Sequence, residues 1–443
     1  TFDDESRHRF KFYVFTGPSQ TWKTRSIRTQ FPIGSPASFT CNDLIAILGR
    51  TSCDWLDQAL RLYARGQLLD LAGIESARVD HVAMVTENLP LGQVAVKREA
   101  TFTVEDYIRE QETYWKPLLI DGEKVDFLSL FEDKLQFHNL SYDFGGGALE
   151  RSDFKRFLSI RQQNIKAHLG LGDSQIHCMN HHYAHSMYAI FSNPACLDKD
   201  WLVLVADGYG DDCSASVGVW RGGAFEFVAK STGSGVGRIY RYVTLLLGMR
   251  PGVDEFKVMG LAPYAREFHW RAVADTLHRY LRVNGMVIDY TNPDKDIYFS
   301  LKEKLRTARF DGIAGGLQKF SEDITTQWTA NAIAETGIGN IVYSGGVAMN
   351  IKINKSMMDM DEVEDLFVGP SGGDESLSIG AAYALWHDKF SDRGPAKPLA
   401  HAYLGPAYSP TEAAAAIRHL GDGFYIYPDP SPGQVAVQLA QGK

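Results

Sequence analysis

The stretch WLVLVADGYGDDCSASVGVWRGGAFEFVAKS, residues 201–231, carries most of the information about the fold. It holds three strand-like apolar runs separated by glycine and aspartate turns, a pattern that predicts a small antiparallel meander. Further along, NIVYSGGVAMN (340–350) and DLFVGPSGGDESLSIGAAYALW (365–386) each read as a buried strand, a Gly-Gly turn and a helix. Strands followed by helices in this way predict an α/β fold.

The bulk composition limits the classes of function. The chain has 443 residues, 44% of them hydrophobic and 22% charged, which is typical of a globular protein with two or three domains. Its net charge of -9 argues against a nucleic-acid surface, because phosphate binding depends on clustered Lys and Arg. We therefore expect no nucleic-acid partner.

Cysteine usage and hydropathy bear on localisation. The five cysteines are odd in number and widely spread, and none forms a C-x-x-C pair, which favours a reducing cytoplasm. No window approaches 18 consecutive apolar residues, and the first residues lack the zones of a secretory signal. The sequence thus predicts a cytoplasmic protein with no membrane partner.

The short run FKFYVF (10–15) predicts a strand, and residues 41–74 show helical spacing.

Three histidines lie within NHHYAHSMYA, residues 180–189. If Asn180 caps a helix here, His181 and His185 stand at i and i+4, so their rings rise from one face and can share a metal ion. His182 then points about 100° away. The spacing alone also fits the polar face of an ordinary helix or a buried, hydrogen-bonded histidine.

Two glycine-rich segments are candidate phosphate or nucleotide sites. In ADGYGDD (206–212), Asp207, Gly208 and Gly210 are expected at a tight turn between strands, where backbone N–H groups could face a phosphate and Asp207 could hold a metal or an amine. A plain hairpin fits the same residues. TGSGVGRIYR (232–241) resembles a phosphate loop superficially, but such a run is more typical of an ordinary loop.

Six segments occur in one order: HHYAHSMYAIF, DGYGDD, GRIYRYVTLLLG, EFKVMGLAPYA, YSGGVAMN and GPSGGDESLSIGAA. In that order, over about residues 177–408, the chain resembles the carbamoyltransferases of the nodulation-factor and antibiotic-tailoring type. The resemblance implies an actin/sugar-kinase-like domain of two α/β lobes over residues 1–395, with an inserted helical region near 101–175. It also implies that residues 401–443 begin a YrdC-like C-terminal domain, which we expect to be truncated.

The resemblance assigns roles to individual residues. It implies that His181, His185 and Asp374 bind a divalent, iron-like metal, and that Asp207 lies near the carbamoyl group. Glu255 and Lys257, also implied to be catalytic, would face the nucleotide. The residues implied to contact the cofactor are Gly208, Gly210, Gly345, Gly346, Asn350, Gly372 and Gly373.

The implied reaction is O-carbamoyl transfer in natural-product or antibiotic biosynthesis. The YrdC-like domain would join carbamoyl phosphate and ATP into carbamoyl adenylate, and the actin-like domain would pass the carbamoyl group to a hydroxyl of a small natural product. The resemblance also makes a homodimer plausible; the acceptor is left open. Two alternatives remain, a tRNA threonylcarbamoyl transferase-like enzyme and an actin-like ATPase switch that transfers nothing. The acidic charge disfavours the first, and the second gives His181 and His185 no role.

Overall fold

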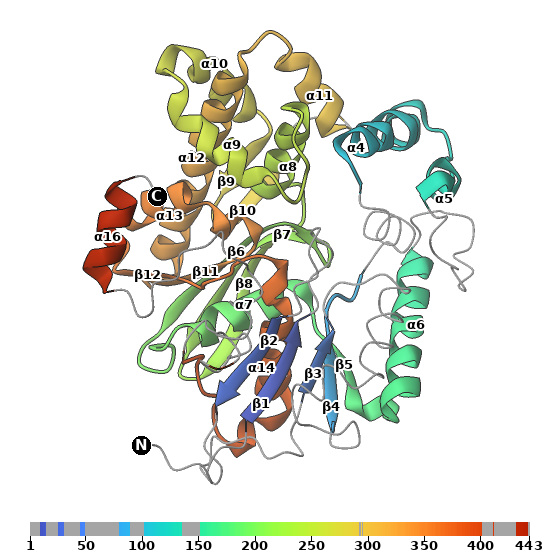
Figure 1. The fold of residues 1–443 in the computed structure, drawn as a ribbon, viewed down its shortest axis with the longest axis vertical. Coiled ribbons are helices and arrows are strands. Elements are labelled where there is room, and N and C mark those ends of the chain that lie inside the picture. Colours follow the sequence, from blue (N-terminus) through green and yellow to red (C-terminus); the bar gives the residue numbers. More distant parts are fainter. Residues whose placement is uncertain are drawn as a thin grey trace. The chain divides into compact units, whose positions relative to one another are not determined.

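The meander predicted from the sequence is present in the computed structural model. Strands β6 (Trp201–Gly210), β7 (Cys213–Arg221) and β8 (Ala224–Ser231) pair antiparallel in sequence order. Strands β11 (Asn340–Ser344) and β12 (Asp365–Val368) extend the sheet beyond β6, and both run parallel to it. The order is β12-β11-β6-β7-β8 (Figure 1). The prediction of an α/β fold is confirmed.

Burial along the strands follows their position in this sheet. The central strand β6 reads as one apolar run because both of its faces are covered. Its alternate residues enter two separate cores: Trp201 and Val203 belong to one cluster, and Leu202 and Leu204 to the other. The edge strand β8 alternates between exposed and partly buried positions, as expected where only one face is covered.

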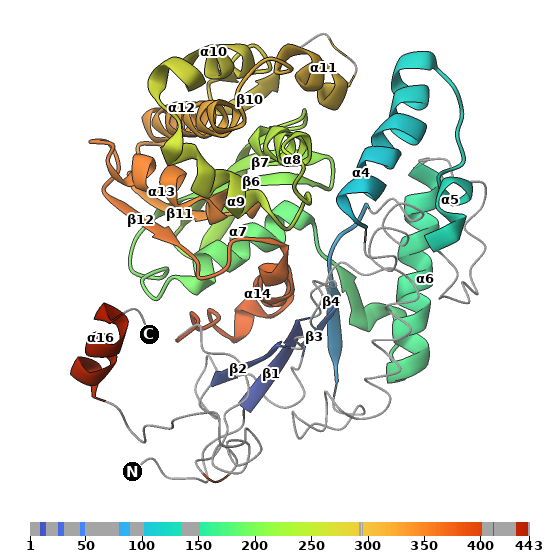
Figure 2. The same ribbon diagram turned by 45° about the horizontal axis from the view of Figure 1, so that its top comes forward.

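Helices cover both faces of the sheet. The first core contains residues of α7 (His181–Ser192) and α14 (Leu377–Phe390), whereas the second contains residues of α8 (Val236–Leu246) and α12 (Phe310–Thr336). Figure 2 shows α7 and α14 on the opposite side of the sheet from α8 and α12. The segment that carries the histidines is therefore part of a core rather than a surface helix.

Helices α7 and α14 cross at very short range. A Cβ on Gly380 would overlap the carbonyl group of Ala184, so this position accepts only glycine without a shift of one helix. Small residues in SLSIGAA thus serve helix packing. The crossing matters for the site, because Ala184 immediately precedes His185 and α14 follows directly after the segment that carries Asp374.

A second set of strands precedes the histidine helix. Strands β3 (Ile45–Leu48), β4 (His81–Met84) and β5 (Ile176–Cys178) form a parallel three-stranded sheet. Strands β1 (Arg9–Val14) and β2 (Arg25–Gln30) form an antiparallel pair, which confirms the strand predicted at the start of the chain. The helical interpretation of residues 41–74 is wrong at β3, since a short apolar run does not distinguish strand from helix; the remainder of that segment lies outside the described residues.

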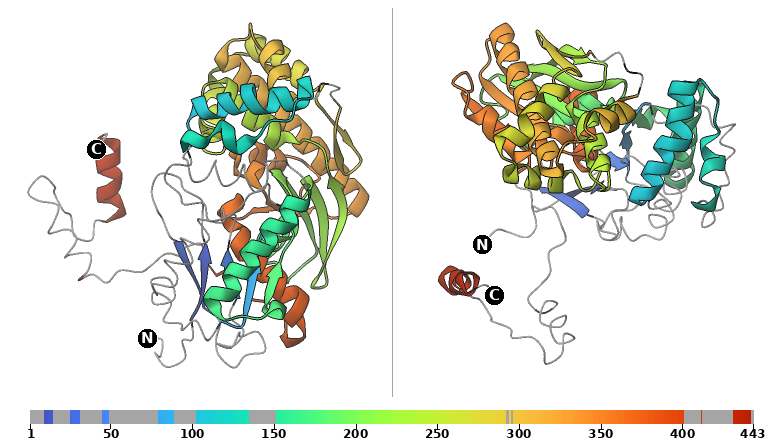
Figure 3. Two further views of the ribbon diagram at one scale, coloured as in Figure 1. Left: turned by 90° about the vertical axis from the view of Figure 1, so that its right-hand side faces the viewer. Right: turned by 90° about the horizontal axis from the view of Figure 1, so that it is seen from above.

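Residues between β4 and β5 are helical where the structure describes them. They form α4 (Val104–Glu110), two π-helical turns at Gln111–Trp115 and Pro117–Asp121, α5 (Phe127–Leu130) and α6 (Arg151–Leu169). An aromatic cluster that includes Phe102, Tyr107 and Tyr114 packs against Leu245 of α8 and Tyr298. Figure 3 shows α4 in teal beside the helices that cover the second core.

The structure describes residues 9–14, 25–30, 45–48, 79–88, 102–134, 151–291, 294, 296–400, 411 and 431–441. The chain separates into two compact units, Thr1–Leu404 and Gly405–Lys443, and the second contains α16 (Pro432–Ala440). In the described part, no helix is both long and apolar enough to cross a membrane.

The first unit contains further short elements. Its remaining helices are α9 (Glu255–Leu261), α10 (Glu267–Leu277), α11 (Ile297–Lys304) and α13 (Ile351–Met358), and its remaining strands are β9 (Leu281–Asn284) and β10 (Val287–Tyr290). The 3-10 turns lie at Glu132–Lys134, Asp173–Gln175, Ala262–Tyr264, Gly346–Met349 (η9), Asp374–Ser376 (η10) and Ser391–Arg393.

Candidate metal centre

The start of helix α7 is fixed from two sides. The Asn180 side chain accepts a hydrogen bond from the backbone N–H of Tyr183 at 3.2 Å, so Asn180 is the predicted cap. Asp211, in the turn between β6 and β7, accepts the backbone N–H of His181 at 2.6 Å. The same carboxylate accepts the N–H of Asn88 at 2.7 Å. Asp211 therefore ties the helix to the sheet and to the segment after β4.

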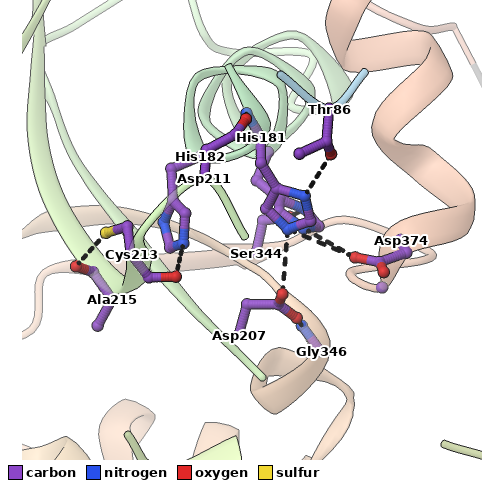
Figure 4. A network of polar contacts seen from close by, with 12 residues as sticks. Thr86, His181, His182, Asp207, Asp211, Cys213, Ala215, Ser344, Gly346 and Asp374 are labelled. Atoms are coloured by element: carbon purple, nitrogen blue, oxygen red, sulfur yellow. Dashed lines mark hydrogen bonds and ion pairs between the residues drawn. The ribbon is translucent and has the colours of Figure 1, made fainter. Parts of the chain in front are cut away.

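His181 and His185 are completely buried and face two carboxylates. Figure 4 shows the ring of His181 directed at Asp207 and Asp374. The Nε2 atom of His181 lies 3.0 Å from Oδ2 of Asp207 and 3.5 Å from Oδ1 of Asp374. The Nε2 atom of His185 also lies 3.5 Å from Oδ1 of Asp374. One ligand atom from each of the four residues falls within 4.8 Å of all the others. The structure thus brings together the three predicted metal ligands and Asp207.

The two carboxylates come from different strand ends of the same sheet. Asp207 lies near the end of β6 and is buried, and its Oδ1 accepts the backbone N–H of Gly346 at 3.0 Å. Asp374 begins η10, just before α14, and its side chain is 36% exposed. The cluster is therefore closed on the histidine side and reachable from solvent past Asp374.

Hydroxyl groups orient the histidine rings. Nδ1 of His181 lies 3.1 Å from Oγ1 of Thr86, and Nδ1 of His185 lies 3.4 Å from Oγ of Ser344. The single hydrogen of the Ser344 hydroxyl is donated to the carbonyl oxygen of Gly372 at 3.3 Å, so its oxygen accepts from Nδ1–H of His185. This tautomer leaves the lone pair of Nε2 directed at the carboxylates, as a metal-ligating histidine requires.

The geometry and the charges both fit a divalent cation. Ligand atoms about 2.1 Å from one ion are separated by roughly 3 to 3.5 Å, which matches the 3.0, 3.5 and 3.5 Å distances of three imidazole–carboxylate pairs here. The two carboxylates, one of them buried, carry negative charge beside the imidazoles, and a divalent ion would balance it. In addition, Nε2 of His185 is buried and makes no hydrogen bond within the described part of the chain. Two histidines with carboxylates suit iron or zinc rather than magnesium.

His182 has a different environment although it is equally buried. Its Nδ1 lies 3.0 Å from Oγ of Ser216, and its Nε2 donates to the carbonyl oxygen of Cys213 at 3.1 Å. Burial, together with the neighbouring His181, lowers the pKa of His182 to about 3, so the ring is neutral. The ring points at the sheet and away from the carboxylates, which agrees with the predicted phase of the helix.

Two predicted cofactor glycines lie at the cluster for steric reasons. A Cβ on Gly210 would overlap the ring of His181, and one on Gly345, where φ is +95°, would overlap the carbonyl group of Ala206. The prediction of a tight turn at Asp207, Gly208 and Gly210 is wrong. These residues belong to β6, where the pairing with β7 is irregular between Ala206 and Gly210, and the turn itself falls at residues 211–212 with φ of 49° and 60°.

The remaining loop residues surround the cluster in different ways. The carbonyl oxygen of Gly372 accepts the N–H of Gly345 at 2.8 Å and so ties the two glycine turns together. Gly373 precedes the turn that begins with Asp374, whereas a Cβ on Gly208 would meet nothing within 4 Å. Asn350 caps α13, and its side-chain amide exchanges hydrogen bonds with Gln318. Its described contacts are structural, and a nucleoside contact stays a prediction.

Glu255 and Lys257 of α9 have partners in the segment just before that helix. Oε1 of Glu255 accepts the N–H of Gly252 at 2.6 Å, and burial raises the pKa of this carboxyl group. Lys257 pairs with Asp254 at 2.7 Å on the surface. Neither residue belongs to the four-residue cluster, so their assignment to the nucleotide stays a prediction.

Sequence reasoning missed the residues that hold the ligands in place. Asp211 and Ser344 lie inside segments that the sequence pattern singles out, DGYGDD and YSGG. Thr86 follows β4 in a segment with no recognisable motif, and the guanidinium of the buried Arg161 donates to its carbonyl oxygen at 3.1 Å. Only the fold brings Thr86 to His181, which is distant in sequence, so no local pattern identifies it.

Fold and cluster together define an α/β protein with a candidate metal centre of two histidines and two carboxylates. Residues 149–383, more than half of the chain, match the family model described as the carbamoyltransferase N-terminus. The chain belongs to this carbamoyltransferase family, which confirms the resemblance found in the sequence.

Relatives of the chain include nodulation proteins. An uncharacterized protein of Methanocaldococcus jannaschii is 30% identical over 279 residues, which cover 61% of this chain and 50% of the relative. Nodulation protein NolNO of Sinorhizobium fredii is 28% identical over 238 residues, covering 53% of this chain and 34% of that protein. The chain thus spans half or less of the length of these two relatives. The crystal structure of T. kodakarensis HypF aligns with a TM-score of 0.37 and 15% identity over 54% of this chain and 39% of that chain, too loosely to support an argument.

Proposed function

We propose that the chain carries the transfer site of an O-carbamoyltransferase, which moves a carbamoyl group to a hydroxyl of a small natural product. The observation that carries the proposal is the buried cluster of His181, His185, Asp207 and Asp374 in a chain of the carbamoyltransferase family. The antiparallel meander with two parallel strands beside it supports an actin-like fold for this domain.

In this proposal His181, His185 and Asp374 hold a divalent metal, with iron as the favoured ion. When bound, the metal supplies Lewis acidity and a template that orients the donor. The chain contributes the rest: Thr86 and Ser344 fix the imidazole rings, and Gly346 fixes one oxygen of Asp207. The 36% exposed side of Asp374 leaves room for substrate to reach the cluster.

The proposed step replaces one carbon–oxygen bond with another. The acceptor oxygen attacks the carbamoyl carbon and forms the new C–O bond, while the bond from that carbon to the phosphoryl oxygen breaks and its electron pair leaves with the phosphate group. Asp207 accepts the proton of the acceptor hydroxyl, since it is the buried carboxylate at the cluster and its Oδ1 is held by a backbone N–H. The products are a carbamate ester and a free phosphate or nucleotide.

The donor is proposed to be carbamoyl adenylate, formed from carbamoyl phosphate and ATP. We assign its synthesis to a YrdC-like domain that begins in the second unit, and nucleotide contacts to Glu255 and Lys257. An actin-like ATPase switch is disfavoured by the cluster itself, because magnesium in such proteins is held by carboxylates and water rather than by imidazole.

The test joins metal analysis to a transfer assay. The purified chain, loaded anaerobically with Fe²⁺, receives carbamoyl phosphate with ATP in one reaction and preformed carbamoyl adenylate in another. Glycerol and hydroxylamine serve as surrogate acceptors, and mass spectrometry detects addition of one carbamoyl group. We expect one metal ion per chain and metal-dependent product, at least from the preformed adenylate. Product formation unaffected by chelation, or no product with either donor, contradicts the proposal.

A further inference from the structure

Arg238 lies in the first turn of α8, directly beside the strand that carries Asp207. Its neighbour Gly237 approaches β6 so closely that a Cβ there would lie 2.7 Å from the carbonyl oxygen of Asp207. Helix α8 also packs against η9, which begins with Gly346, the residue whose N–H holds the Asp207 carboxylate. Helix α8, which carries Arg238 in its first turn, is therefore adjacent to two of the segments that build the cluster.

The guanidinium of Arg238 is oriented but unmatched in charge. Its central carbon lies 5.4 Å from the centre of the Tyr209 ring, a cation–π contact, and Tyr209 follows Asp207 by two residues on β6. The side chain is half-buried, and within the described part of the chain it makes no hydrogen bond and no ion pair. A partly desolvated guanidinium with unused donors favours an anionic ligand.

Arg241, one turn further along α8, shows what a structural arginine looks like in this helix. It also lies over a tyrosine, with its central carbon 5.7 Å from the centre of the Tyr107 ring. Burial opposes the charge of Arg241, but its pKa is raised, first by the neighbouring Tyr107 and then by Glu255 and Glu110. Arg238 has the same kind of aromatic support, and it differs from Arg241 in lying next to Gly237, which contacts the backbone of Asp207.

The glycines around Arg238 are explained by packing rather than by phosphate binding. A Cβ on Gly235 would lie 3.0 Å from Oγ of Ser214, and Gly237 contacts the backbone of Asp207. Two glycines of the run TGSGVGRIYR, Gly235 and Gly237, are thus explained by close contact with the sheet, and Gly233 by its contact with Tyr290. The arginine that follows them contacts Tyr209 and makes no hydrogen bond or ion pair in the described residues.

We propose that Arg238 binds the phosphoryl group of the carbamoyl donor at the metal centre. This inference rests on the proposed function and specifies what the site recognises in the donor: a phosphoryl group joined through oxygen to the carbamoyl carbon in a mixed anhydride. When the bond from that carbon to the phosphoryl oxygen breaks, negative charge grows on the oxygen, and a preplaced guanidinium stabilises it. Two parallel N–H donors match two phosphate oxygens, which a lysine cannot reproduce.

Calorimetry on the metal-loaded chain tests the proposal with inorganic phosphate, pyrophosphate and AMP as probes. We expect Arg238→Gln to weaken binding of at least one probe about 10- to 100-fold, the usual effect of losing a charge-assisted pair. Arg238→Lys should fall between, because it keeps the charge and loses the fork. Arg282→Gln, which removes an exposed arginine of β9, is the matched control and should bind like the unaltered chain.

Each outcome bears on one proposal. Equal binding by the unaltered chain and Arg238→Gln, or no binding of any probe to the unaltered chain, overturns the role of Arg238. Arg238-dependent binding without any carbamoyl transfer supports the anion site and counts against the proposed function. If the chain transfers the carbamoyl group and Arg238→Gln leaves both kcat and KM for carbamoyl adenylate unchanged, the proposed function is supported. The same result overturns the role of Arg238. Unchanged metal content and an unchanged melting temperature exclude misfolding of Arg238→Gln as the cause of weaker binding.

Discussion

The two faces of helix α7 carry the same residue type in opposite roles. His181 and His185 on one face and His182 on the other are all completely buried. On the first face the Nε2 atoms meet Asp207 and Asp374, whereas on the second both ring nitrogens of His182 are engaged by a serine hydroxyl and a backbone carbonyl. Burial therefore says nothing about which histidine binds a metal.

What separates the faces is the chemistry of the opposing surface. A hydroxyl and a carbonyl satisfy a neutral ring completely and leave no lone pair for an ion. Two carboxylates next to imidazole nitrogens create a charge that only protons or a cation can compensate. The same sheet supplies both surfaces, since Ser216 lies within β7 and Asp207 near the end of β6. One helix thus joins a core contact to a candidate metal centre.

The largest loss of metal and activity is expected from removing a histidine on the face of α7 that meets the two carboxylates, which we call the carboxylate face. His181→Ala or His185→Ala removes one of two imidazole ligands, and we expect metal content to fall below one-tenth of the unaltered level and carbamoyl transfer to be abolished. The fold should survive with reduced stability, because each change deletes one buried ring while the strand pairing of the sheet and its two cores remain. Metal analysis by mass spectrometry and the transfer assay measure both effects. Full activity in either variant contradicts the metal assignment.

His182→Ala sharpens the comparison from the other side. It deletes two buried hydrogen bonds and leaves the Ser216 hydroxyl and the Cys213 carbonyl without the ring, so we expect a loss of about 2 to 4 kcal/mol in the free energy of unfolding. Metal content per folded chain should remain near one, with transfer reduced far less than in His185→Ala. Urea titration followed by circular dichroism measures the first quantity. Equal loss of metal in all three histidine variants would show that the two faces do not differ in function.

Much of this arrangement could be predicted from the sequence, for a physical reason. The meander, the two later strand-helix units and the histidine helix all follow from local periodicity and capping, as at Asn180. The i, i+4 spacing alone put His181 and His185 on one face. The prediction that they meet Asp374 depended on the family resemblance, because no local pattern encodes the crossing of α7 and α14 at Gly380.

The residues that could not be predicted act through tertiary contacts. Thr86 and Ser344 are short hydroxyl side chains with no distinctive spacing, and each acquires its role only by facing an imidazole from another element. The irregular pairing at the end of β6 was also invisible, because D-G-x-G is typical of turns and here sits inside a strand. Local chemistry therefore predicts candidate ligands better than it predicts what supports them.

The smallest effect expected is from loosening the support of one ring while keeping all ligands. Ser344→Ala removes the oxygen that accepts from Nδ1–H of His185, so the ring loses its fixed tautomer and orientation. Such losses typically weaken metal affinity 10- to 100-fold. The matched control is Ser186→Ala, another buried serine of α7 whose hydroxyl donates only to the carbonyl oxygen of His182 in its own helix at 2.8 Å. Competition with a chelator of known affinity measures both variants. Equal affinity in the two would show that ring orientation is set by packing alone, and that the carboxylate face of α7 needs no hydroxyl support.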